Sequence, residues 1–244
     1  MTDRKKFIIR LLIHILGAIL IGLGVQTVVY SSIGAAPLDA LTYYLSRISL
    51  QLFANSDFSH IKTMLGILSL LVGTIVTIIL WFIRKDKKLI FTWLNIALAA
   101  LTIFTWGILF DSLLPLKDIF YQKLLVGLSG IIVLSIGVFL TIISGLPAGP
   151  HEELLKIYDE KIKNVFISKL IVEVTYLILA FIAMVISLVV IDKGSVKFDQ
   201  VGWFTILTIV SVSILLHVYN VVYLKIKNIN KIRKDDQNES QSLY

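Results

Sequence analysis

The chain has 244 residues, 57% of them hydrophobic and 16% charged, and its mean hydropathy is +0.88. This composition is far too apolar for a water-soluble domain of this size and is typical of a polytopic membrane protein. The chain contains no cysteine, which excludes disulfides, thiolate metal sites and cysteine nucleophiles, and its formal net charge is +7.

Six apolar runs follow one another along the chain, and each has the length of about 20 residues that a helix needs to cross a bilayer. They are residues 7–30, 62–83, 90–111, 124–146, 166–191 and 201–224. The first run follows the basic start MTDRKK, but it is long and lacks a small-residue cleavage site, so we expect a retained helix rather than a signal peptide. The sequence thus predicts an all-α membrane protein with six transmembrane helices.

The basic residues alternate from loop to loop. Seventeen of the 23 lysines and arginines lie around the start of the first run, between the second and third, around the start of the fifth, or after the sixth, and the other six lie on the opposite side. Because cytoplasmic segments are enriched in lysine and arginine, we predict that both termini are cytoplasmic. The tail, residues 226–244, is basic and is expected to become disordered and to contact anionic lipid headgroups. Nucleic-acid binding is not expected.

A short signature occurs twice, as SSIGAAPLDAL from Ser31 and as SGLPAGPHEEL from Ser144. When the two copies are aligned on Pro37 and Pro150, an offset of 113 positions, the match extends upstream through the preceding helices, while the later helices align only with small gaps. Gly17 then falls on Gly130, Gly24 on Gly137 and Asp39 on Glu152.

Each half of the chain has three predicted spans, so the two halves must enter the membrane from opposite sides. We therefore predict two inverted-topology repeats, residues 1–115 and 116–225, an arrangement that many secondary transporters use around a site near the membrane midplane. Duplication of a stable three-helix unit without a transport role is the alternative.

The glycines and prolines of each signature predict that the helix breaks and then restarts as a short segment. The restarted segments, PLDALTYYLSRISLQLF and PHEELLKIYDEKI, are too short or too polar to be ordinary spans, and we expect them to be re-entrant or interfacial. Acids in their first turns either cap exposed N–H groups or face a cavity, where they favour a proton or a cation. The candidate substrate-binding residues are Gly34, Pro37, Asp39, Asn95, Gly149, Pro150 and Glu152.

Polar residues inside the spans are costly in lipid and therefore worth attention. Glu173 lies in an otherwise apolar helix, either as a proton or cation site or as half of a buried pair with Lys169, one turn earlier. A lone membrane histidine more often provides a hydrogen bond than a metal ligand, so we expect no metal site. The candidate coupling-ion residues are Asp111, Glu173 and His217.

Three stretches, GLGVQTVVYSSIGAAPLDALTYYLS, LNIALAALTIFTWGILFD and GVFLTIISGLPAGPHEELL, resemble the YczE/YyaS/YitT-type bacterial integral membrane proteins, nearest to the YczE-like branch. The resemblance covers residues 10–222 and implies a bacterial inner (plasma) membrane protein. It does not identify a substrate. Pro147 stands where that family's pattern has glycine, and Glu152 and Glu153 follow His151 where it has a lone aspartate. The positions that match the pattern are Gly22, Gly24, Gly34, Pro37, Asp39, Asn95, Asp111, Gly149, Pro150, Glu152 and Glu173.

The sequence has no phosphate-binding glycine loop, no HExxH and no GxSxG, so we expect neither an enzyme nor a cofactor. The leading hypothesis is a secondary transporter or permease for a small solute, coupled to protons or cations. The alternatives are a non-transporting scaffold or accessory subunit of a membrane enzyme or export complex, and lipid translocation between leaflets. The expected partners are the lipid bilayer, a small solute, and a second copy of the chain or another membrane protein.

Overall fold

A computed structural model describes residues 3–53, 57–87, 89–146, 149–163, 165–191 and 199–242. Over these residues the chain is helical, without strands, and Pro147 lies outside them. The helices are α1 (Asp3–Ser31), α2 (Pro37–Phe53), α3 (Ile61–Arg84), α4 (Leu89–Asp111), α5 (Phe120–Ser144), α6 (Pro150–Ile162), α7 (Val165–Val185), the π-helical η1 (Ile186–Ile191) and α8 (Trp203–Ser242).

Six of the described helices are long and apolar enough to cross a membrane, which confirms the prediction of a helical chain with six such segments. They are α1, α3, α4, α5, α7 with η1, and the part of α8 up to Ile226. Large apolar side chains cover their outer faces; Phe82, Leu101 and Leu125, for example, are each 60–68% exposed. An apolar surface of this extent would be unstable in water and suits a lipid environment.

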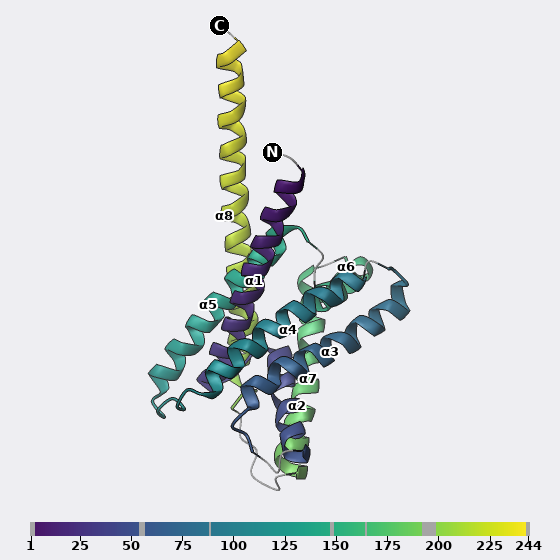
Figure 1. Cartoon of the computed structure of the whole chain (residues 1–244), viewed down its shortest axis with the longest axis vertical. Coiled ribbons are helices and arrows are strands. Elements are labelled where there is room, and N and C mark those ends of the chain that lie inside the picture. The colour runs from purple at the N-terminus through teal and green to yellow at the C-terminus, as the bar shows by residue number, and fades with distance from the viewer. Residues whose placement is uncertain are drawn as a thin grey trace.

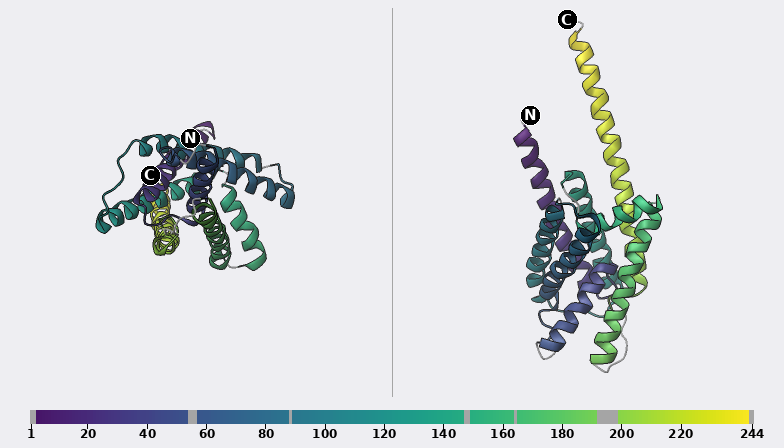
Figure 2. Two further views of the ribbon diagram at one scale, coloured as in Figure 1. Left: turned by 90° about the horizontal axis from the view of Figure 1, so that it is seen from below. Right: turned by 90° about the vertical axis from the view of Figure 1, so that its right-hand side faces the viewer.

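The two termini lie at the same end of the molecule, where α1 and α8 extend beyond the other helices (Figures 1 and 2). The short helix α2 packs along α7, and both run to the opposite end. The helix α8 continues to Ser242, through the segment for which the sequence predicts a disordered tail.

The helices α1 and α5 cross in antiparallel directions with their backbones in contact. A Cβ atom added to Gly17 would lie 2.8 Å from the Gly137 carbonyl oxygen, and one added to Gly24 would lie 2.5 Å from the Leu134 amide nitrogen. Only glycine leaves room for so close an approach, which lets long stretches of the two helices gain dispersion contacts. This crossing forms the centre of the helix assembly.

The predicted helix breaks are confirmed at both copies of the signature. The helix α1 ends at Ser31 and α2 begins at Pro37, while α5 ends at Ser144 and α6 begins at Pro150. Gly34, with φ of +142°, turns the chain after α1, and a Cβ there would lie 2.9 Å from the Thr205 amide nitrogen at the start of α8. The proline ring then fixes the first φ of each new helix.

Candidate functional site

A group of acids and one histidine gathers where α2 and α6 begin beside α7. Asp39 is in the first turn of α2, His151 and Glu152 are in the first turn of α6, and Glu173 is in α7. The Nε2 atom of His151 lies 3.7 Å from Oε1 of Glu173, and its ring lies 5.3 Å from the ring of Tyr176. We call Asp39, His151, Glu152 and Glu173 the acid–histidine cluster.

The environment of the cluster favours proton binding at two of its members. Burial raises the pKa of Asp39 to about 7, and the charge of Glu173 adds to this rise while that of His151 opposes it. Burial alone would lower the pKa of His151, but a hydrogen bond to Glu173 and the charge of Glu152 raise it above its ordinary value. Protons can therefore be held at the cluster near neutral pH.

The cluster retains some access and an unused polar atom. The side chains of His151 and Glu173 are 26% and 14% exposed, so a small molecule reaches part of each. The Nδ1 atom of His151 is buried and has no hydrogen-bond partner among the described residues. Since buried polar atoms are normally paired, the unpaired Nδ1 beside three carboxyl groups is free to bond a proton or a ligand.

A chain of polar contacts leads from α1 to the start of α6. The Nε2 atom of His14 lies 2.9 Å from Oδ1 of Asn95, and its Nδ1 lies 3.1 Å from Oγ of Ser144. A Cβ on Gly149 would lie 3.6 Å from Nδ2 of Asn95 and 2.6 Å from Oε2 of Glu152. Asn95 therefore lies beside the acid–histidine cluster, and the absence of a side chain at Gly149 lets Glu152 approach the α6 N-terminus.

Lys169 does not pair with Glu173, although one helical turn separates them in the sequence. Its Nζ atom donates a hydrogen bond to Oγ of Ser213 on α8, at 2.6 Å. The partner of Glu173 within ion-pair distance is instead His151. The cluster thus joins α6 to α7, while Lys169 joins α7 to α8.

Two of the predicted coupling residues lie elsewhere. Asp111, at the end of α4, accepts hydrogen bonds from the backbone N–H groups of Lys62 and Thr63, at 3.0 and 2.8 Å. It thereby satisfies donors in the first turn of α3 that would otherwise lack a partner. His217 is exposed on α8, one turn after Ser213.

Two polar contacts that the sequence did not single out join α2 and α6 to other segments. At one, the hydroxyl groups of Tyr43 and Tyr44 donate hydrogen bonds to Asp199, and the Gln200 amide donates to the same carboxylate at 2.9 Å. At the other, Arg84 at the end of α3 pairs with Glu153, 3.2 Å away, and with Glu160 on α6. The sequence does not point to Asp199, because this residue lies outside the apolar runs in which polar residues stand out.

Within the described ranges, no group of three or more histidine or acid side chains is arranged to hold a metal ion.

No curated protein and no solved structure matches the chain. One family model does match, over residues 8–221, and it describes a family of unknown function, DUF6198. This match takes in all six long apolar segments up to the middle of α8, together with both helix breaks and the whole acid–histidine cluster. The chain therefore belongs to the DUF6198 family of unknown function.

Proposed function

We propose that this protein is a secondary transporter or permease that moves a small solute across the membrane with protons as the coupling ion, and that the acid–histidine cluster is its site. The observation that carries the proposal is the placement of three carboxyl groups and a histidine between helices whose outer faces are apolar. Placing ionisable groups in such surroundings costs free energy, and residues of this kind usually line the path of an ion or a substrate.

An inverted-topology repeat is part of the proposal, and the α1–α5 contacts support it. In a two-fold arrangement, exchanging each residue with its counterpart 113 positions away should reproduce the contacts. Gly17 meets Thr141, and the exchanged pair, Gly130 and Val28, is also in contact. Gly24 meets Leu134, and the exchanged pair, Gly137 and Ile21, is in contact as well.

The same exchange relates α2 to α6, because Pro37 and Pro150 are equivalent positions. The cluster then lies where the two equivalent broken-helix starts approach α7, which agrees with the position of sites in transporters built from inverted repeats. The halves would be residues 1–115 and 116–225.

Two polar contacts would close this site in alternation. The Tyr44–Asp199 contact holds α2 to the segment before α8, and the Arg84–Glu153 contact holds α3 to α6. Opening one while the other stays closed would expose the cluster to one side of the membrane at a time. We place both termini in the cytoplasm of a bacterial cell, since most of the basic residues lie in the segments that the alternation of spans assigns to the same side as the termini.

A ligand screen tests the assignment of the site. The detergent-purified chain is heated with small cations, amines, amino acids and neutral metabolites, and a compound that binds the folded state raises Tm by mass action. The shift should be lost in Asp39→Asn and Glu173→Gln and kept in Asp118→Asn, whose side chain is 98% exposed. A shift that survives in all three variants would place the ligand elsewhere, and no shift with any compound would favour the scaffold hypothesis.

A further inference from the structure

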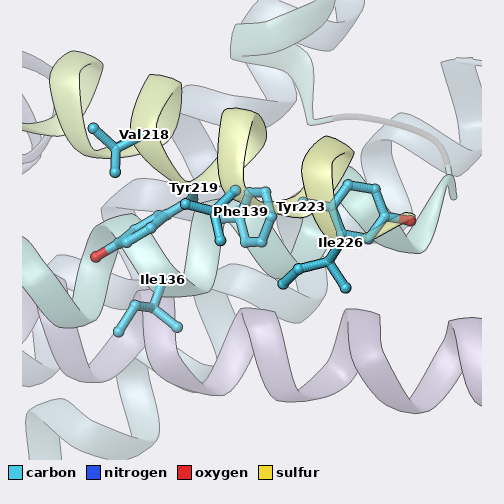
Figure 3. Close-up of a pocket in the computed structure, with 7 residues that line it drawn as sticks. Ile136, Phe139, Val218, Tyr219, Tyr223 and Ile226 are labelled. Carbon is cyan, nitrogen blue, oxygen red and sulfur yellow. The ribbon is translucent and has the colours of Figure 1, made fainter. Parts of the chain in front are cut away.

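An open, entirely apolar groove lies between α5 and α8 (Figure 3), and no residue of the acid–histidine cluster lines it. Its volume is about 380 Å³, within the range of small-ligand sites. Its lining consists of Ile136, Phe139, Val218, Tyr219, Val222, Tyr223 and Ile226.

Aromatic rings shape the floor of this α5–α8 groove. The Phe139 ring of α5 lies 5.6 Å from that of Tyr219 and 6.0 Å from that of Tyr223. The two tyrosine hydroxyls point in opposite directions, away from the Phe139 ring (Figure 3). The groove therefore offers no polar group along its length to a polar solute.

Basic residues follow the lining residues of the groove along the sequence of α8. Lys225 is exposed next to the lining residue Ile226, and the following turns of α8 carry four more basic residues. The exposed Arg10 of α1 donates to the backbone carbonyls of Ser144 and Gly145, where α5 ends. Phe139 is about 8 Å from Ser144 along the helix axis.

We infer that this groove binds an anionic phospholipid, with one acyl chain along Phe139 and Val218 and the headgroup at Lys225. The apolar lining matches a hydrocarbon chain, and tyrosines near a helix end are typical of the headgroup level. Anionic headgroups attract lysine and arginine beside a membrane, so the basic end of the groove favours an anionic lipid. A second copy of the chain is a poorer occupant, because packing two such basic ends together around one groove would be repulsive.

The test uses the full chain in detergent, with thermal unfolding in dioleoyl-phosphatidylglycerol and in dioleoyl-phosphatidylcholine. At a phosphatidylglycerol concentration about 100-fold above its Kd, Tm should rise by roughly 5 °C or more, and the neutral lipid should give a clearly smaller rise. Equal rises with the two lipids would overturn the inference.

A matched pair of tryptophan variants tests the position of the lipid, and a lysine variant tests its charge. Val218→Trp fills the groove and should remove most of the phosphatidylglycerol shift, whereas Val210→Trp, on the same helix and similarly exposed, should keep it. Lys225→Gln should reduce the preference for the anionic lipid. Equal shifts in the two tryptophan variants contradict the inference, and so does a dimer in light scattering that Val218→Trp dissociates. None of these results depends on solute transport.

Discussion

The Nε2 atom of His151 lies 3.7 Å from Oε1 of Glu173, and this contact joins the first turn of α6 to an otherwise apolar stretch of α7. The histidine is thereby held beside two further carboxyl groups, on Asp39 and Glu152. A proton added to or removed from this group changes the charge where the starts of α2 and α6 lie beside α7.

Replacing Glu173 should lower the pKa of His151. The variant Glu173→Gln removes the charge and weakens the hydrogen bond that favour the imidazolium form, while the lowering effect of burial stays. The measurement is a pH titration of the histidine side-chain resonances, which is tractable because the chain has four histidines and His151→Gln assigns the signal. Glu160→Gln, with its 68% exposed side chain, is the control, and equal titrations in the two variants would contradict the assigned pairing.

The raised pKa of Asp39 should make the free energy of unfolding fall as the pH rises from about 4 towards 7. Its pKa of about 7 in the folded state exceeds the ordinary value of 3.8, so in this window the unfolded chain releases a proton that the folded chain still holds. Between pH 5 and 7, the free energy of unfolding should fall by about 2 kcal/mol more in wild type than in Asp39→Asn.

Unfolding curves recorded at several pH values in one detergent measure this difference. Asp118→Asn should keep the wild-type slope of unfolding free energy against pH. The side chain of Asp118 is exposed, and the hydrogen bond from Lys123 lowers its pKa, so it is ionised in both the folded and the unfolded chain between pH 5 and 7. If Asp39→Asn also keeps that slope, the carboxyl group of Asp39 is not held in the protonated form.

A larger side chain at Gly130 should break the α1–α5 crossing. A Cβ there would lie 2.8 Å from the backbone nitrogen of Val28, and a backbone atom in a packed helix cannot move aside. Gly130→Val should lower the free energy of unfolding by about 3 kcal/mol, at the upper end of overpacking costs. Ser129→Val, at the neighbouring exposed position, should cost much less. Chemical unfolding compares the two, and similar losses would contradict the close approach.

Removing the Asp111 side chain should weaken the fold and leave coupling intact. Asp111→Ala leaves the N–H groups of Lys62 and Thr63 without their acceptor, and loss of such a cap costs about 1–2 kcal/mol. Asp111→Asn keeps one acceptor and should cost less. Stability and solute-driven proton flux per folded protein are measured together; unchanged stability with lost flux would instead give Asp111 the coupling role.

The long helices could be predicted from the sequence because lipid leaves the backbone no partners other than its own groups, so each apolar run must be helical. The breaks after Ser31 and Ser144 could also be predicted, since glycine and proline act locally. The start of α5 at Phe120, four residues before the apolar run at 124–146, shows that hydropathy marks the lipid-facing part of a helix and not its first turn.

The contacts of the polar residues could not be predicted in the same way, because they depend on how the helices cross. Spacing along one helix favours Lys169 as the partner of Glu173, but the position of α6 brings in His151 instead. Asp111 occurs at the end of an apolar run, as a coupling residue would, and only the packing of α4 on α3 shows that it caps a helix.

The most direct test of the central claim is proton movement in proteoliposomes that contain a trapped pH-sensitive dye. A solute identified by its thermal shift is added outside, and the internal pH is followed for wild type, Asp39→Asn and Asp118→Asn. The account predicts a solute-dependent pH change in wild type and Asp118→Asn that Asp39→Asn loses while remaining folded. A pH change of equal size in all three proteins, or solute uptake in wild type without any pH change, would contradict proton coupling at the acid–histidine cluster.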